Sequence, residues 1–499
     1  MKQPTGARGA IILLLVLAVT SVLGYVFNVV LAWLLPASDY GIYGVALAIS
    51  GILCIFIIYA FPWSVVKFLS AEKEQEKRVS VFKTALLANF LTALVISGLF
   101  YCIYFFLFSS SDIPLPVIFV LISIVLIFSI RSIYLRTLHG LMRFEQMGAV
   151  SVVEVVVSVA AGLGLVYLGY GVAGALAGEL IGGIVVMIIA LYLLRDFKFW
   201  QGKDWANVKV LSFAWPMFLG MVGITLLSKI DILGLKYLSQ GLIPSQSVGH
   251  YQAVRVLAMI PLFLAGGIMG GVFPFISRHH EEGGLGYLVS SLRYVVLLLL
   301  PVAVVLVLLP ASIIGLFFPH DYVASANALR VLAVGGACLA VIQVLTSGFQ
   351  ALGQPGIPVR ALMLATGVQI ASLVVLVPRF GLVGAAASTA IACLSAMVWL
   401  LSRLANIYQL KPKNSQIAKL ILALAVTGLF LSFFPHSSRI LTVLDCVLAG
   451  IIYLSLLIVL RLVREDDVDI LRNALPHNRL VEAVTNGVKK VIVKFNKVS

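Results

Sequence analysis

The sequence predicts an all-α membrane protein of about fourteen spanning helices, and three observations lead to this fold class. Of the 499 residues, 61% are hydrophobic and only 11% are charged, whereas roughly a quarter of the residues in a soluble domain carry a charge. The apolar residues form long runs, such as 11–19 and 117–130, which lack the alternation of a membrane barrel strand. A helix also satisfies its backbone hydrogen bonds internally, as hydrocarbon requires.

Fourteen spans follow from the rule that about 20 apolar residues cross the hydrocarbon. The first apolar run begins after Lys2 and Arg8 and extends to about residue 35, which is too long for the core of a signal peptide. All five cysteines lie inside apolar runs and lack the spacing of a metal site or a disulfide framework. The expected spans are 9–35, 40–69, 81–108, 114–138, 146–169, 172–194, 210–238, 248–277, 286–317, 323–351, 356–378, 382–404, 416–434 and 440–462.

The basic residues predict the orientation of these spans. The chain has 35 Lys and Arg residues against 20 Asp and Glu, a net charge of +15. With a cytoplasmic N-terminus, 29 of the 35 fall in the cytoplasmic connections, the termini or the adjoining span ends, three in or next to outer connections, and three deeper within spans 7 and 8. Because positive residues collect on the cytoplasmic side, both termini are expected there. The basic excess is explained by orientation, so we expect no nucleic-acid partner.

An internal repeat indicates that the first twelve spans arose by duplication. Its matches are small residues and glycines, which permit tight turns and close helix packing in lipid. Chance similarity between apolar stretches is the alternative explanation, but the matches also occupy equivalent spans. The matching pairs are 170–177 with 380–387 at an offset of 210, 40–43 with 248–251 at 208, and Gly140 with Gly353 at 213.

The repeat predicts two lobes of six spans each, within residues 1–200 and 201–410. Six is an even number, so the lobes run in the same direction and are related by an axis along the membrane normal, as in transporters that work by alternating access. Two further spans are expected within 411–465, outside the duplication. A basic cytoplasmic tail, 466–499, is either a helix lying on the anionic inner leaflet or a solvated segment.

Three short stretches resemble the polysaccharide transporter branch of the multidrug/oligosaccharidyl-lipid/polysaccharide (MOP) superfamily. They are 35–43, 229–231 followed by 248–251, and 350–355. The resemblance covers the first twelve spans and implies a fold like that of the superfamily's toxin-extrusion (MATE) transporters. It further implies a Wzx-like flippase of the inner (plasma) membrane.

The expected substrate is an undecaprenyl-diphosphate-linked oligosaccharide, a unit of O-antigen, capsule or exopolysaccharide, moved from the cytoplasmic to the outer leaflet. A complex with a polysaccharide polymerase or ligase is compatible with the resemblance. No cofactor is expected.

Buried charges in spans 7 and 8 are the leading site candidates. Lys229, Asp231 and Arg255 lie at similar depth, ~12–15 Å below the outer surface at 1.5 Å per helical residue. A charge at such depth is costly and indicates a cavity or a partner. Lys229 and Arg255 suit a diphosphate in a cationic cavity, with Lys236 as a third cation or as a residue that reaches the surface. Asp231 is their counter-ion, a coupling carboxylate or part of a structural ion pair.

Four charged residues of the first half are further candidates. Glu154 in span 5 and Glu179 in span 6 are expected to bind a coupling ion, H⁺ or Na⁺, although helix-to-helix hydrogen bonding explains them equally well. Arg131 and Arg136, at the inner end of span 4, suit a cytoplasmic entrance for the phosphate headgroup. Anchoring of the span by basic residues is the alternative.

Three other functions compete with the flippase of sugar units. A multidrug or cation antiporter needs an acidic cavity, which the cations Lys229 and Arg255 oppose, whereas a lipid II flippase fits the same charges. A membrane-embedded glycosyltransferase or ligase needs an acid/base or metal-binding outer loop, and the longest outer loop, 240–247, has no acidic residue. No nucleophile–base grouping or nucleotide-binding motif occurs, so we expect no enzyme activity and energy from an ion gradient, the membrane potential or substrate asymmetry.

Overall fold

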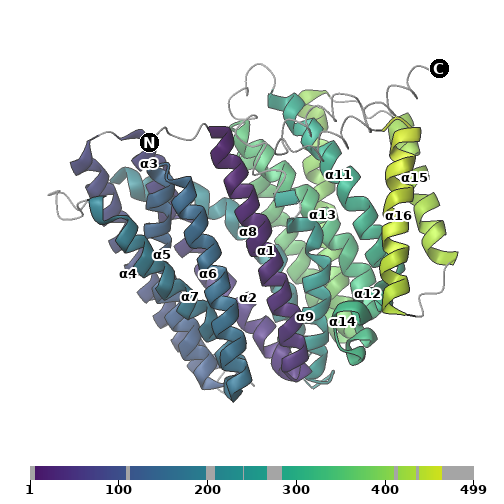
Figure 1. Ribbon diagram of the computed structural model, residues 1–499, viewed down its shortest axis with the longest axis horizontal. Coiled ribbons are helices and arrows are strands. Elements are labelled where there is room, and N and C mark those ends of the chain that lie inside the picture. Colours follow the sequence, from purple (N-terminus) through teal and green to yellow (C-terminus); the bar gives the residue numbers. More distant parts are fainter. Residues whose placement is uncertain are drawn as a thin grey trace.

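The computed structural model describes residues 6–72, 74–107, 113–197, 208–239, 241–263, 265–266, 284–409, 414–433 and 438–462. Within these residues every regular element is helical, and ten helices are long and apolar enough to cross a membrane. The chain is therefore a multi-pass membrane protein, as predicted. In Figure 1 most helices of the first half (blue) lie side by side on the left, those of the second half (teal to green) lie toward the right, and the first helix (purple) runs down the middle. That the chain has fourteen spanning helices stays a prediction.

The first half follows the expected spans, with one division. The second expected span breaks at Ala60 between α2 and α3. Pro62 stands in the first turn of α3, where its missing N–H has no helical partner to lose. The elements are α1 (Gly6–Leu34), α2 (Ala37–Tyr59), α3 (Phe61–Ala71), α4 (Gln75–Leu107), α5 (Leu115–Gly140), α6 (Phe144–Leu165), the π turn η1 (Val166–Tyr170), α7 (Gly171–Leu193) and the short η2 (Arg195–Phe197).

The second half divides in the same way before a proline. The expected span 286–317 breaks at Leu309, ahead of Pro310. Its elements are α8 (Val208–Leu238), α9 (Gln246–Ala258), α11 (Gly284–Leu308), α12 (Pro310–Phe317), η3 (His320–Ser325), α13 (Ala326–Ala351) and α14 (Gly356–Tyr408). Two helices follow, α15 (Asn414–Phe433) and α16 (Arg439–Val459), which pack on each other and on α11. The expected tail 466–499 lies outside the described residues.

Two glycines at the same point of each half support the repeat. Gly171 has φ +52° and ψ −136°, and Gly381, 210 residues later, has φ +52° and ψ −122°. Residues with a Cβ rarely adopt this conformation. Each glycine reverses the chain between two helices, so that α14 is two helices joined at Gly381, just as α6 and α7 meet at Gly171.

The predicted match of Gly140 with Gly353 was wrong by two residues. The residue that caps the end of α5 is Leu141, at φ −81° and ψ 7°, and the residue that caps the end of α13 is Leu352, at φ −80° and ψ 6°. The next residues are Met142 (φ +59°) and Gly353 (φ +76°). Gly353 therefore corresponds to Met142 at an offset of 211. The sequence comparison paired two glycines, whereas one half places a methionine in the left-handed conformation.

The two halves meet where α2 packs against α8 and α9. Three glycines of α2, Gly41, Gly44 and Gly51, lie on the side of the helix that packs against α8 and α9. A Cβ on Gly41 would come within 2.7 Å of the Gly249 backbone nitrogen, and one on Gly44 within 2.7 Å of the Gln252 side chain. The absence of these side chains lets the helices approach closely. The lobe boundaries at residues 200 and 410 stay a prediction.

Candidate functional site

A buried ion pair joins α8 to α9 in the second half. Arg255 Nε donates to Asp231 Oδ2 at 3.2 Å, and the Asp231 side chain is fully buried while that of Arg255 is 8% exposed. Tyr251 donates its hydroxyl to the same oxygen at 3.0 Å. The shared depth predicted for Asp231 and Arg255 is thus a direct contact. The pair is one of the three readings given above for Asp231.

The remaining polar groups of Arg255 are also held by the protein. Its Nη1 donates to Gln252 Oε1 at 3.1 Å and its Nη2 donates to the carbonyl oxygen of Ser228. Asp231 Oδ1 accepts the backbone N–H of Ile232 at 2.9 Å. A charge buried with this many partners is compensated, so the network fixes the position of Arg255 at the junction of α8 and α9.

Lys229 lies beside this network but is not part of it. Its Cε would be 3.2 Å from a Cβ on Gly51 of α2, so the glycine leaves room for the aliphatic stem. Among the described residues, the Lys229 ammonium has neither a hydrogen-bond partner nor a carboxylate within ion-pair distance. A partly buried cation without a direct ion-pair partner is chemically able to bind an anion.

A cavity of about 440 Å³ connects these residues with α1. Lys229, Gln252 and Arg255 line its side formed by α8 and α9. No Asp or Glu stands among the described residues that line it. The remaining lining residues are apolar or neutral polar ones, and the polar ones on α1 are Thr20, Ser21, Tyr25 and Asn28. The cavity is thus bounded by both halves and positively charged.

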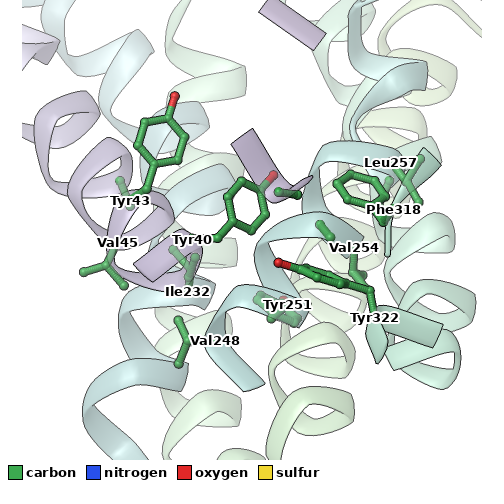
Figure 2. Close-up of a cluster of buried hydrophobic side chains, with 14 of the residues drawn as sticks. Tyr40, Tyr43, Val45, Ile232, Val248, Tyr251, Val254, Leu257, Phe318 and Tyr322 are labelled. Carbon is green, nitrogen blue, oxygen red and sulfur yellow. The ribbon is translucent and has the colours of Figure 1, made fainter. Parts of the chain in front are cut away.

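A cluster of buried aromatic side chains packs between the two halves (Figure 2). Tyr40 and Tyr43 of α2, Tyr251 of α9 and Tyr322 of η3 are all at most 1% exposed. Tyr40 and Tyr322 pack with their ring centroids 6.2 Å apart. Trp33 of α1 donates to the Phe317 carbonyl oxygen at 2.9 Å. These contacts join the two halves at the ends of α1 and α12, the end that the orientation analysis places outside.

The charged candidates of the first half are brought together in part. Arg131 of α5 forms an ion pair with Glu154 of α6, at side-chain exposures of 14% and 11%. Its guanidinium also lies 4.7 Å from the ring centroid of Phe128. Arg136 instead lies 4.4 Å from the ring centroid of Trp63. The entrance candidate Arg131 is therefore the ion-pair partner of the coupling candidate Glu154. The other entrance candidate, Arg136, lies against Trp63 instead.

Two further candidates lie away from the pair in α8 and α9. Glu179 of α7 has no hydrogen bond or ion pair within the part of the chain that the structure describes, although its charge interacts with that of Lys229 at longer range. Lys236 lines a different cavity, of about 220 Å³, with Ser38 and Ser245. The predicted third cation of the main cavity therefore lies outside it.

Sequence reasoning missed the contribution of α1. Tyr25 and Asn28 line the cavity, and Tyr251 supports Asp231. The available signal was an amide and a phenol within an otherwise apolar first span, which is the same signal that singled out the charged residues of spans 7 and 8. Neutral polar residues are common at helix–helix contacts, so this signal alone does not separate lining from packing.

Comparisons with known proteins identify a matching family and solved structures with the same fold. The model of the family described as polysaccharide biosynthesis proteins matches residues 7–280, more than half of the chain. The chain is 24% identical over 397 residues to a putative O-antigen transporter of Shigella flexneri, which covers 75% of this chain and 92% of that protein. A solved structure of the lipid II flippase MurJ, in its inward closed conformation, superposes with a TM-score of 0.68 at 15% identity, over 88% of this chain and 96% of that one.

An archaeal relative matches over a shorter segment. The chain is 25% identical over 182 residues to a probable low-salt glycan biosynthesis flippase of Haloferax volcanii, 36% of this chain and 39% of that protein. The alignments with the archaeal relatives thus span less than two fifths of those proteins. The structural likeness at 15% identity concerns the fold, and the expected resemblance to the polysaccharide transporter branch is confirmed.

Proposed function

This chain belongs to the polysaccharide biosynthesis protein family, and from that premise we propose that it moves an undecaprenyl-diphosphate-linked oligosaccharide from the cytoplasmic to the outer leaflet by alternating access. The observation that carries the proposal is the cationic cavity between the halves, with the uncompensated ammonium of Lys229 in its wall. The names of its relatives in Shigella and Haloferax agree with this class of substrate.

The charge of the cavity fits a diphosphate headgroup. A diphosphate is anionic at neutral pH, and a cation in a site of low dielectric constant binds it strongly. Lys229 offers a mobile point charge, whereas Arg255 is held by Asp231, Gln252 and Ser228. We assign phosphate binding to Lys229 first, with the two free N–H groups of Arg255 as secondary donors.

The shape of the cavity supports loading from the cytoplasmic side. From Asn28 and Lys229 its lining extends along α1 to Leu17 and past the end of α9 to Phe263, toward the ends that the positive-inside rule assigns to the cytoplasm. The aromatic contacts of Figure 2 join the halves toward the opposite end, where we propose that they keep the cavity closed to the outer side. In this proposal the lobes, residues 1–200 and 201–410, rock about the cavity while α15 and α16 stay peripheral, with both termini cytoplasmic.

Energy coupling is assigned to Glu179. Asp231 and Glu154 are engaged in ion pairs, so neither is free to exchange a cation without exposing a buried arginine charge. Glu179 lacks such a partner among the described residues. A carboxylate of this kind, set in the membrane near a cationic site, suits the binding of H⁺ or Na⁺. A complex with a polysaccharide polymerase or ligase remains part of the proposal.

The rival functions differ in the charge they require. A drug or cation antiporter needs acidic lining, and no described lining residue of the main cavity is acidic. A lipid II flippase shares the diphosphate and is separated from the proposal by its sugar only. A glycosyltransferase would need an acid/base or metal site facing bound substrate, and the carboxylates near the cavity are ion-paired or isolated.

Deletion of the protein in its native host tests the proposal. We expect lipid-linked oligosaccharide to accumulate on the cytoplasmic leaflet, and export to return with the wild type and with Lys229→Arg, which keeps the cation. Lys229→Gln should reduce export at least tenfold at equal membrane abundance. Lys419→Gln on α15, away from the cavity, is the matched control and should restore export. Unchanged glycans together with altered drug resistance would overturn the proposal in favour of the antiporter.

A further inference from the structure

We propose that Tyr25 and Asn28 of α1 form a sugar-binding subsite that recognises the first sugar attached to the diphosphate. The inference rests on the proposed function and assigns a second role within the same cavity. It divides the headgroup between two walls: the phosphates against Lys229 on α8 and the sugar against α1.

One face of α1 forms a whole wall of the cavity. Its lining residues recur at helical spacing and include three polar side chains besides Asn28 and the backbone of Gly24. Opposite them stand Lys229, Gln252 and Arg255. A ligand between these walls therefore has its anion on one side and neutral hydrogen-bonding groups on the other.

Two polar atoms on this wall are buried without partners. Tyr25 Oη and Asn28 Oδ1 each lack a hydrogen bond within the described residues. The Asn28 amide nitrogen is already engaged, because Nδ2 donates to the Gly24 carbonyl oxygen at 2.9 Å. The ring of Tyr25 is held edge-on against Phe317, with centroids 6.2 Å apart and planes at 84°. Buried polar groups are nearly always satisfied, and these two atoms have no partner within the described residues. Both are also covered from water in this conformation, so the proposed sugar reaches them when the walls of the cavity separate.

The chemistry of the two atoms selects a sugar rather than a phosphate. Asn28 Oδ1 is a hydrogen-bond acceptor and repels the phosphate oxygens, which are also acceptors. It needs a donor, which a sugar hydroxyl or an acetamido N–H provides. The Tyr25 hydroxyl donates and accepts, and so matches a second sugar hydroxyl. The two residues lie about one helical turn apart, roughly 4.5–5 Å along α1, which is the scale of one hexose ring.

Thr20 on the same face supplies a matched control. It lines the same cavity, but its hydroxyl already donates to the Leu17 carbonyl oxygen at 3.1 Å. A Thr20→Val variant removes a hydroxyl that already has a hydrogen-bond partner, so it changes the polarity of the wall without removing an unpartnered polar atom. Any general effect of altering α1 should appear in this variant as well.

Binding to purified, full-length protein tests the subsite. The probes are undecaprenyl diphosphate without a sugar and the same lipid carrying one hexose or one N-acetylhexosamine. The wild type should bind at least one sugar-bearing probe about tenfold more tightly than the bare diphosphate. Asn28→Ala and Tyr25→Phe should each reduce that preference several-fold while keeping the affinity for the bare probe, and Thr20→Val should keep both.

Each outcome separates the subsite from the proposed function. If the wild type binds bare and sugar-bearing probes equally, or if Asn28→Ala and Tyr25→Phe keep the wild-type preference, the subsite is refuted while the flippase proposal stands. If the wild type binds none of the probes, the proposed function itself fails. Should Asn28→Ala misfold, seen as a lost unfolding transition, Tyr25→Phe alone decides, because it removes only one oxygen atom.

Discussion

The two halves each bury one Arg–carboxylate pair between consecutive helices, but they surround it differently. In the second half, Arg255 is bonded to Asp231, Gln252 and Ser228 and lines the main cavity. In the first half, Arg131 meets Glu154 and the ring of Phe128, and its Nε is buried without a partner. By the offset of about 210 these pairs lie on helices that are not equivalent, because α9 corresponds to α2 and α13 to α5. Neither pair is the repeat of the other: one is a rigid polar network and the other a simpler pair.

The charged lining residues of the cavity that the structure describes, Lys229 and Arg255, both belong to the second half. The network neutralises Arg255 and holds α8 and α9 together, whereas Lys229 beside it has no direct ion-pair partner among the described residues. No lining residue of the cavity comes from the Arg131–Glu154 pair. We therefore expect removal of the carboxylate charge of Asp231 to lower the free energy of unfolding more than removal of the carboxylate charge of Glu154.

The largest expected effect comes from Asp231→Asn. The substitution keeps the shape of the side chain but leaves the buried Arg255 without a counter-charge, which costs about 3–5 kcal/mol in the free energy of unfolding. Thermal or denaturant unfolding of the purified protein in detergent measures it. Lys229→Gln is the control, since Lys229 lies outside the network and its loss should leave stability near that of the wild type. Equal stability of Asp231→Asn and wild type would break the contrast.

In the first half, Glu154→Gln removes the carboxylate charge of the other buried pair and should cost less in the free energy of unfolding, about 2 kcal/mol, the range of a hydrogen bond to a charged group. Arg131 is more exposed than Arg255 and retains its contact with the Phe128 ring. The same unfolding measurement compares the two variants directly. A cost equal to that of Asp231→Asn would show that the extra hydrogen bonds in the second half add nothing.

A smaller effect is expected where the halves place different residues in the same left-handed backbone conformation. Gly353 and Met142 are equivalent residues with positive φ, and a Cβ on Gly353 would meet no atom within 4 Å. Gly353→Ala should therefore destabilise the protein by about 1 kcal/mol through backbone strain alone. Met142→Gly should raise the unfolding temperature slightly, because the methionine is 56% exposed and loses little packing. A loss of stability in Gly353→Ala together with a gain in Met142→Gly would support the equivalence of the two residues. A change of stability in the same direction in both variants would contradict it.

The smallest effect concerns an ion pair outside the spans. Arg143 donates to Asp196 through Nη1 at 3.2 Å and through Nη2 at 2.5 Å, and this hydrogen bonding lowers the pKa of the Asp196 carboxyl. A lowered folded-state pKa stabilises the protein above the ordinary Asp value near 4, and the contribution is lost as the pH falls through the lowered pKa. The equivalent residues 210–211 positions later, Gln354 and Asn406, carry no charge.

Asp196→Asn should consequently lower the unfolding temperature slightly at pH 7 and not at all once the wild-type carboxyl is protonated. The effect is small because Asp196 is 59% exposed and its pair is screened by solvent. Unfolding temperatures of wild type and variant give the comparison when they are measured from pH 7 down to a pH well below the ordinary Asp value, where the lowered pKa has also been passed. A temperature difference that persists at the lowest pH would show that the carboxylate charge is not its source.

Much of the site could be anticipated from the sequence because charge is rare in hydrocarbon. Asp231 and Arg255 stood out within apolar runs, and counting residues along each helix placed them at one depth. The turn glycines 171 and 381 were found as a repeated pattern, since the conformation they adopt is open to few other residues. The equivalence of Met142 and Gly353 was missed, because a methionine gives no sign of a positive φ.

By itself, the amino-acid sequence determined the helical membrane fold, the duplication and the identity of the charged residues, since these depend on composition and on spacing along one helix. Only the tertiary structure decided which charges are neutralised. The pairing of Arg131 with Glu154, the exclusion of Lys236 from the main cavity and the entry of α1 into its wall all depend on how separate helices rotate and approach. In lipid that approach is set by side-chain packing between helices, which no single helix contains.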